Sequence, residues 1–239
     1  MIDRLTIRAR PNRKPLLQQS WGKLLFMHWR IEAEKLRPLL PSQLEIDTFD
    51  GAAWIAVVPF TMWDTRLRIL PPVPGFSDMH ELNVRTYVHL NGVPGVWFFS
   101  LDCNSLSVVL GARSLYHLPY YNAVIELKQS GLTIDYSLRR TDTAGAEFHG
   151  IWKIGEPLPP SEPESLTFFL TERYCLYSEH NGRIYRALIH HPTWPLQAAS
   201  VSEYDSTMIE ALGLEAPEDA PLLHYAESID VDLWGLKSV

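Results

Sequence analysis

The chain has 239 residues, of which 46% are hydrophobic and 21% charged, and its formal net charge is −7. A globular chain of this length buries roughly 70% of the surface that its unfolded form exposes. It therefore does not need disulfides or metals to stabilise its core. The negative charge argues against binding nucleic acid or an anionic membrane through the surface as a whole. Its apolar runs are also shorter than the ~20 residues of a membrane helix.

Two features of the chain bear on its location. Residues 1–15 are rich in arginine, but no apolar run follows them. We therefore interpret this segment as a basic surface arm rather than a secretory signal, and we expect a cytoplasmic protein. The two cysteines, Cys103 and Cys175, lie far apart and match no metal-binding spacing. Two free, buried thiols are typical of a reducing compartment.

In the first third of the chain, the pattern predicts a helix over residues 32–40, which ends at the prolines that follow. Two strands, over residues 44–49 and 52–60, flank an Asp-Gly pair that is typical of a hairpin turn. Residues 61–77 are rich in proline and predict a long, irregular loop. Loops of that length often line or cover functional sites.

The rest of the chain alternates hairpins with short helices. Asn91-Gly92 and Asn181-Gly182 are strong hairpin signals, and a Ser-x-x-Glu capping box begins at Ser161. The predicted strands cover 80–90, 96–102, 121–128, 132–138, 147–154, Cys175–His180, Arg183–His190 and 222–234. The predicted helices cover 104–114 (capped by Asn104), 161–173 and 206–212. This order indicates one antiparallel, β-rich domain over residues 1–239 with a few short helices.

The common catalytic and metal-binding motifs are absent. The sequence has no dinucleotide-binding or phosphate-binding glycine motif, no Gly-x-Ser-x-Gly, no His-Glu-x-x-His and no paired-cysteine zinc motif. His190 and His191 are adjacent on a predicted strand, so they would point to opposite faces. We therefore expect neither a metal nor a cofactor.

One predicted strand carries a row of polar side chains. Glu81, Asn83, Arg85 and Tyr87 alternate with apolar residues, so they share one face. If that face lines an interior cavity, it would bind a carboxylate or a carbonyl group. The alternative is that the row is the solvated face of a sheet.

A second group of polar side chains lies at a predicted helix-to-strand junction, GARSLYHLPYYNA. It includes Arg113, Tyr116, His117, Tyr120 and Tyr121. Junctions of this kind often direct side chains into a site, although tyrosines here would equally serve as core rings.

Several segments together resemble the bacterial YqjF-like family (domain of unknown function 2071), for which no activity is established. They are WGKLLFMHWRI, LLPSQLEIDTFDGAAWIAVVPF, HELNVRTYVHLNGVPGVWFFSLD, GARSLYHLPYYNA and RIYRALIHHPTWPLQ. The resemblance covers the chain almost from end to end.

A more distant resemblance is to acetoacetate decarboxylase. It implies a closed or cone-shaped, β-rich sheet around a ligand cavity. The decarboxylase segment Gly-Phe-x-Asp-x-x-Glu is matched by residues 75–81, which carries its active-site glutamate over to Glu81. The Schiff-base lysine of the decarboxylases lies in Phe-Pro-Lys-Lys, and the matching residues here are Leu118-Pro119-Tyr120-Tyr121. A phenol cannot form an imine with a ketone, so the resemblance implies a retained cavity without imine chemistry.

Three hypotheses follow. In the first, the protein binds a small carboxylate or carbonyl compound, with Trp63 of the proline-rich loop as a lid. In the second, it is a lysine-independent lyase or isomerase acting on a keto acid, with Glu81 as general acid or base and Arg85 or Tyr120 stabilising an enolate. In the third, it is a structural, oligomer-forming protein with a vestigial cavity. Homo-oligomers are compatible with all three. The predicted ligand-binding residues are Trp63, Asn83, Arg85, Arg113, Tyr116, His117 and Tyr121.

Overall fold

The computed structural model describes residues 2–67, 79–142 and 145–239. The strands are β1 Leu17–Ile31, β2 Glu45–Ile46, β3 Ala53–Leu67, β4 Met79–Leu90, β5 Val93–Cys103, β6 Tyr120–Ser130, β7 Thr133–Arg140, β8 Glu147–Pro157, β9 Cys175–His180, β10 Arg183–His190, β11 Leu196–Ser206, β12 Leu222–Leu233 and β13 Lys237–Ser238. The α-helices are α1 Ala33–Leu36, α2 Leu106–Tyr116 and α3 Leu166–Thr171, and the 3-10 helices are η1 Thr6–Arg8, η2 Arg37–Leu39 and η3 Glu210–Leu212. The β-rich prediction with few short helices is confirmed. None of the helices in the described parts of the chain is long and apolar enough to cross a membrane.

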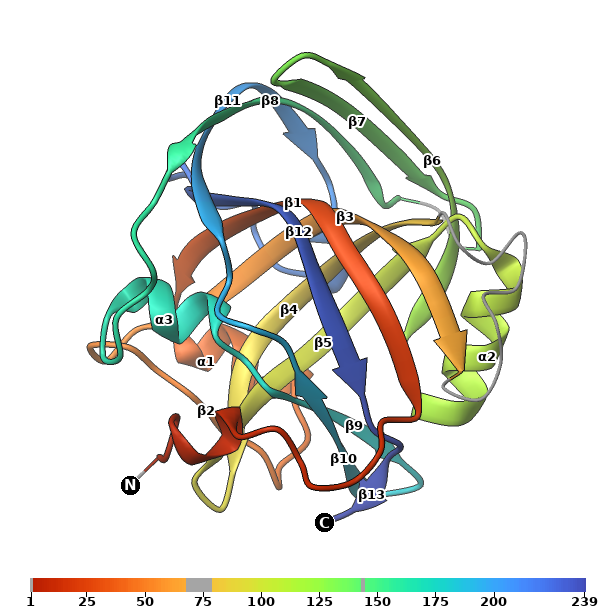
Figure 1. Cartoon of the computed structure of the whole chain (residues 1–239), viewed down its shortest axis with the longest axis vertical. Helices are drawn as coiled ribbons and strands as arrows, with labels where there is room; N and C mark the ends of the chain where they lie inside the picture. The colour runs from red at the N-terminus through yellow and green to blue at the C-terminus, as the bar shows by residue number, and fades with distance from the viewer. Residues whose placement is uncertain (1, 68–78, 143–144) are drawn as a thin grey trace.

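The strands form one sheet that closes on itself (Figure 1). One ring runs from β5 through β6, β7, β8, β11, β12, β1, β3 and β4, and the pairing of β4 with β5 closes it. A second path joins β5 to β12 through β9 and β10. The five strands β12, β1, β3, β4 and β5 belong to both rings, and we call them the shared wall. Most pairings are antiparallel as predicted, whereas β5 pairs in parallel with β6 and β9. Parallel neighbours need a crossover connection, which α2 supplies between β5 and β6.

The middle parts of β1 and β3 in the shared wall are buried on both faces. On β1 and β3, the continuous runs 24–29 and 53–62 are buried without interruption. Phe26 and Val58 face a first core, which also contains side chains from α2, α3, β9 and β10. Leu25 and Val57 face a second core, built with β6, β7 and β8. Because both faces are dry, these strands have an almost continuously apolar sequence instead of an alternating one.

Short turns connect many of the strands as the sequence predicts. Three Asx-Gly turns, at residues 50–51, 91–92 and 181–182, hold both residues at positive φ, 48–53° for Asp or Asn and 75–78° for Gly. That combination defines the type I′ turn, whose twist matches paired strands. Two of these turns join the predicted hairpins β4–β5 and β9–β10, and the predicted hairpin β6–β7 turns at Gly131; the strand pairings confirm all three.

Two predictions for the first third of the chain are wrong. The turn at residues 50–51 closes only a single bridge, Phe49 with Ala52, and the short β2 pairs with β4 rather than with β3. The predicted loop over residues 61–77 begins too early, because β3 continues to Leu67 along β1. Pairing with β1 supplies hydrogen bonds that local sequence does not reveal. The remainder of that loop, residues 68–77, lies outside the described residues.

Three helix boundaries also differ from the predictions. Asn104 does not cap α2, because its side-chain oxygen accepts a hydrogen bond from the His80 amide at 3.0 Å. Helix α3 begins after Ser165, whose hydroxyl accepts from the Phe168 amide, while Ser161 donates to Glu172 instead. The helix predicted at residues 206–212 is reduced to η3, because β11 extends to residue 206. Strand β11 was not predicted, since most of its side chains are partly or fully exposed and show no alternation.

The basic arm lies against the body of the protein. Arg10 forms an ion pair with Asp232, with a shortest N–O distance of 2.6 Å, and Arg8 donates to Thr193 at 3.1 Å. The predicted free, buried cysteines are confirmed. Burial raises the pKa of each thiol to about 12, so both stay protonated at neutral pH.

Two glycines provide a matched test of how closely β12 and Trp63 pack against β1. An alanine Cβ at Gly22 in β1 would lie 2.1 Å from the backbone oxygen of Glu227 and 2.4 Å from the Trp63 ring. At Gly111 in α2, a Cβ would contact nothing within 4 Å. We expect Gly22→Ala to lower the free energy of unfolding by about 3 kcal/mol through overpacking. Gly111→Ala should raise it by about 0.5–1 kcal/mol through helix propensity. Urea denaturation measures both, and an unchanged value for Gly22→Ala would contradict the close approach of β12 to β1.

Candidate functional site

A cavity of about 250 Å³ lies within the first core. Apolar side chains of the shared wall, α2, β9 and β10 make up most of its lining. The polar side chains are few, as in most small-molecule sites, where they fix the orientation of a ligand. They are Gln19, Thr65, Glu81, Asn83, Arg85, Ser107, Tyr116, Tyr120, Thr171, Arg173 and His191.

The polar row on β4 faces this cavity. Glu81, Asn83 and Arg85 line it, and Tyr87 is buried in the same core. Only 2% of Glu81 and 5% of Asn83 is exposed. The row is therefore not a solvated face of the sheet, and its polar groups depend on one another or on a ligand for hydrogen bonds.

Glu81 lies in an environment that favours its neutral form. Its Oε2 atom accepts a hydrogen bond of 2.8 Å from the Tyr120 hydroxyl. Burial raises the pKa of the carboxyl to about 8, although hydrogen bonds from Tyr120 and Asn83 oppose that shift. At neutral pH, the carboxyl is therefore mostly protonated and can donate a hydrogen bond as well as accept one.

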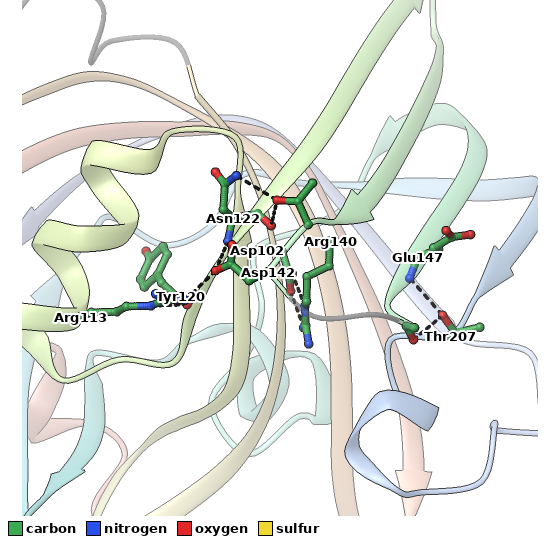
Figure 2. A network of polar contacts seen from close by, with 10 residues as sticks. Asp102, Arg113, Tyr120, Asn122, Arg140, Asp142, Glu147 and Thr207 are labelled. Atoms are coloured by element: carbon green, nitrogen blue, oxygen red, sulfur yellow. Dashed lines mark hydrogen bonds and ion pairs between the residues drawn. The ribbon is translucent and has the colours of Figure 1, made fainter.

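Groups behind the cavity hold this pair in place. The Tyr136 hydroxyl donates to the backbone oxygen of Glu81 at 3.0 Å. Arg113 donates to the backbone oxygen of Tyr120 at 2.7 Å and to Asp142 at 2.8 Å (Figure 2). These contacts fix the backbone at both residues, so the Tyr120–Glu81 hydrogen bond is set before any ligand binds.

A buried ion pair between Arg140 and Asp102 lies close to Glu81. Arg140 binds Asp102 through two hydrogen bonds of 2.6 and 2.8 Å, which Figure 2 also shows. Burial raises the pKa of Asp102, and the arginine opposes that shift. The charge of Asp102 in turn raises the pKa of Glu81.

Arg85 is a cation without a carboxylate partner. None of the ion pairs among the described residues includes it. Its Nη2 atom lies 3.5 Å from the backbone oxygen of Leu170, and its guanidinium carbon lies 5.3 Å from the centre of the Phe26 ring. Its buried Nε atom has no hydrogen-bond partner. A guanidinium in this state has donors available for an anion.

Arg173 is a second guanidinium at the cavity, and we did not predict it. It donates to the backbone oxygen of Phe169 at 2.6 Å and to Asp47 at 2.7 Å, while its Nη2 atom is buried without a partner. Arg4 of the basic arm binds the same Asp47 carboxylate, so the single negative charge of Asp47 is shared between the two guanidinium groups. The sequence does carry a feature that could have indicated Arg173 as a buried polar residue, since the charged pair Glu172-Arg173 lies within an otherwise apolar stretch.

The two adjacent histidines face different environments, since β10 ends at His190 and His191 follows it. His191 lines the cavity and stacks on Tyr174 with 4.5 Å between ring centres. Burial lowers its pKa. His190 borders a separate surface depression beside Arg10. Within the described ranges, no group of three or more His, Cys, Asp or Glu side chains could hold a metal ion.

Four of the predicted ligand-binding residues lie outside the cavity lining. Arg113 is exposed and pairs with Asp142, and Tyr121 lies under Arg140 because it faces away from its neighbour Tyr120. His117 stacks on His180, with 4.1 Å between ring centres. Trp63 lies on β3, and its ring packs over Gly22. Strand alternation accounts for Tyr121, whereas Arg113 lies on the exposed side of α2 and His117 ends that helix in a left-handed conformation.

The lysines of the chain also lie away from the cavity. All six, Lys14, Lys23, Lys35, Lys128, Lys153 and Lys237, are within the described residues, and none belongs to the lining. Residues 75–78, which match the decarboxylase segment before Glu81, lie outside the described part of the chain.

The raised pKa of Glu81 predicts a pH-dependent stability. Between the ordinary pKa of 4.5 and about 8, the unfolded chain loses this proton while the folded protein keeps it. The wild type therefore loses stability as the pH rises through this window, by up to about 1.4 kcal/mol per unit. Glu81→Gln removes this dependence. The unfolding free energy of the variant minus that of the wild type should therefore increase as the pH rises from 5 to 8.

The control is Glu126→Gln on the exposed part of β6, where no such gain is expected. Chemical denaturation at several pH values measures the difference. A constant offset between Glu81→Gln and the wild type would contradict a protonated, buried Glu81.

Comparison with known proteins identifies relatives whose similarity covers nearly the whole chain. The family profile DUF2071, described as an uncharacterized conserved protein, matches residues 18–230. The "Uncharacterized protein YqjF" of Bacillus subtilis (strain 168) is 43% identical over 223 residues, which are 93% of this chain and 92% of that protein.

Solved structures share the fold at much lower identity. The enduracididine biosynthesis enzyme MppR, in complex with pyruvate, has a TM-score of 0.65 at 13% identity and covers 95% of this chain and 91% of its own. An acetoacetate decarboxylase-like enzyme from Sphingomonas wittichii RW1 gives 0.64 at 12%, covering 95% and 94%. Acetoacetate decarboxylase from Legionella pneumophila gives 0.63 at 14%, covering 95% and 88%. The predicted acetoacetate decarboxylase-like fold is thereby confirmed.

Proposed function

Because the chain belongs to the uncharacterized conserved family DUF2071, its relatives supply no activity, and we propose a function from the cavity itself. The acetoacetate decarboxylase-like fold provides a small-molecule cavity. We propose that its ligand is a carboxylic acid that also carries a carbonyl oxygen. The observation that carries this proposal is the guanidinium of Arg85, which has no carboxylate partner and an unsatisfied Nε atom, in the same cavity as the buried Glu81 carboxyl that Tyr120 positions.

Each end of such a ligand has a partner. Arg85 would bind the carboxylate, because charge-assisted hydrogen bonds are strong where water is excluded. The Glu81 carboxyl, positioned by Tyr120, would donate to the carbonyl oxygen, and Asn83 and Tyr116 lie along the same cavity. The apolar lining would enclose the remaining carbon atoms.

A structural neighbour supports the choice of a keto acid. MppR, which shares the fold, has been solved with pyruvate. Pyruvate carries the same pair of groups, a carboxylate and a carbonyl.

We further propose that binding does not involve an imine. An imine needs an amine, and no lysine lines the cavity. The sequence resemblance puts Tyr120 and Tyr121 at the positions of the decarboxylase lysines. Burial raises the pKa of Tyr120 well above its usual value, and Tyr121 lies outside the cavity lining.

A second candidate function is supported by the state of Glu81. A buried carboxyl with a pKa near neutrality is suited to general acid–base catalysis. In this version, Glu81 would protonate a carbonyl oxygen, or would remove an adjacent proton in its anionic form, and Tyr120, which already binds Glu81, would stabilise the enolate. Isomerisation, hydration or decarboxylation of a keto acid would fit.

Ligand binding is tested by thermal shift with a panel of short and long keto acids. A ligand at 100 times its Kd should stabilise the wild type by about 2.7 kcal/mol. Arg85→Met should abolish the shift, whereas the exposed Arg139→Met, which loses the same charge, should keep it. If no keto acid stabilises the wild type, the proposal is wrong.

Glu81→Gln separates binding from catalysis. The amide keeps a donor and an acceptor but cannot release a proton, so it should retain binding and lose any turnover of the bound ligand. Turnover that survives intact in this variant would contradict a catalytic Glu81.

Borohydride trapping tests the absence of an imine. Wild-type protein incubated with acetoacetate and borohydride should keep its mass, because no lysine lines the cavity to form an imine there. A mass increase equal to one reduced ketone, mapped to a single lysine, would contradict this proposal.

A further inference from the structure

The two ionisable side chains of β4 that line the cavity, Glu81 and Arg85, lie well apart. Glu81 and Arg85 lie four residues apart on one face of β4, and β4 pairs with β3 without irregularity from Phe60–Glu81 to Ala56–Arg85. A strand rises about 3.3 Å per residue, so the two Cα atoms are about 13 Å apart. A ligand that contacts both side chains must span most of that distance.

Different elements fix the two ends. The Glu81 carboxyl is held by Tyr120, which follows α2. The Arg85 guanidinium leans toward Tyr87, 5.9 Å from its ring centre, and approaches the backbone oxygen of Leu170 in α3. It therefore points away from Glu81. Figure 1 shows α2 and α3 at opposite sides of the molecule.

The positive charge is confined to the Arg85 end. Arg173 also packs against Tyr87, 4.6 Å from its ring centre, so the two guanidinium groups flank one tyrosine. Each has a buried nitrogen without a hydrogen-bond partner. The nearby carboxylate, Asp47, is already shared between Arg173 and Arg4. An anion would therefore be stabilised at this end and not at the neutral Glu81 end.

The middle of the cavity is largely apolar. The cross-strand neighbours of Asn83 are Val58 on β3 and Leu101 on β5, and both line the cavity. The volume of about 250 Å³ is large beside the 10–15 Å³ that one water needs. A ligand as small as pyruvate would leave most of this space empty and could not contact both ends.

We propose that the ligand of this cavity is an elongated oxo carboxylic acid, with its carboxylate at Arg85 and its oxo group at Glu81. This inference rests on the proposed function and adds the distance between the two groups. Because the Arg85 side chain points away from Glu81, the guanidinium and the carboxyl are at least as far apart as the two Cα atoms, about 13 Å. Allowing a hydrogen bond of about 2.9 Å at each end leaves at least about 7 Å for the ligand, or roughly six or more bonds of an extended carbon chain. The preferred class is therefore a medium-chain acid with a remote oxo group, rather than a 2-oxo or 3-oxo acid.

Two isomers test this directly by titration calorimetry. In 7-oxooctanoate the oxo group is six bonds from the carboxyl carbon, whereas 2-oxooctanoate has the same atoms with the two groups adjacent. The wild type should bind 7-oxooctanoate at least tenfold more tightly than 2-oxooctanoate, octanoate or pyruvate. Octanoate should lose affinity because it leaves the Glu81 donor without a partner.

Variants identify which end provides each contact. Glu81→Leu, which replaces a neutral buried carboxyl by an apolar side chain of similar size, should abolish the preference for 7-oxooctanoate over octanoate. Arg85→Met should lower the affinity for both 7-oxooctanoate and octanoate at least tenfold, and Arg139→Met should change neither affinity. A preference for 7-oxooctanoate that survives Glu81→Leu would overturn the inference.

The outcomes distinguish this inference from the proposed function. If 2-oxooctanoate or pyruvate binds more tightly than 7-oxooctanoate, and does so through Arg85, the elongated ligand is wrong while the keto-acid function stands. If no oxo acid binds at all, both proposals are wrong.

Discussion

The pairing of β4 with both β3 and β5 closes the sheet, and the chemistry of the protein depends on that closure. It makes the shared wall an interior structure with a core on each face. Polar side chains on β4 are then held in a space from which bulk water is largely excluded. In such surroundings, an unpaired polar group is costly and a well-placed partner is worth more than it would be in water.

Three of the buried carboxyl groups are stabilised in different ways. Asp102 is neutralised by the two hydrogen bonds from Arg140, and Asp47 is shared by two arginines. Glu81 has no cation among its hydrogen-bond partners and instead holds its proton, because burial raises its pKa. Arg85 follows none of these patterns. A guanidinium cannot lose its proton, so its donors remain available for an anion from outside the chain.

The fold is shared with MppR and with acetoacetate decarboxylase-like proteins of solved structure. At 12–14% identity, these proteins share the arrangement of strands with this chain, and that likeness shows the fold alone. Function is set by the residues that line the cavity. Here that lining contains tyrosines and arginines and no lysine. The side chains that line this cavity therefore supply hydrogen bonds and positive charge.

The sequence alone determined the local features. Asx-Gly pairs specified hairpin turns, because only a few residues tolerate positive φ, and alternation on β4 placed Glu81, Asn83 and Arg85 on one face. Tertiary structure decided which face was dry, how far β3 extended, and that β11 formed at all. It also brought Asp47 and Arg173 together, 126 residues apart in the chain. Local patterns encode dihedral angles and periodicity, whereas the pairing of distant strands depends on closure of the whole sheet, which no short segment specifies.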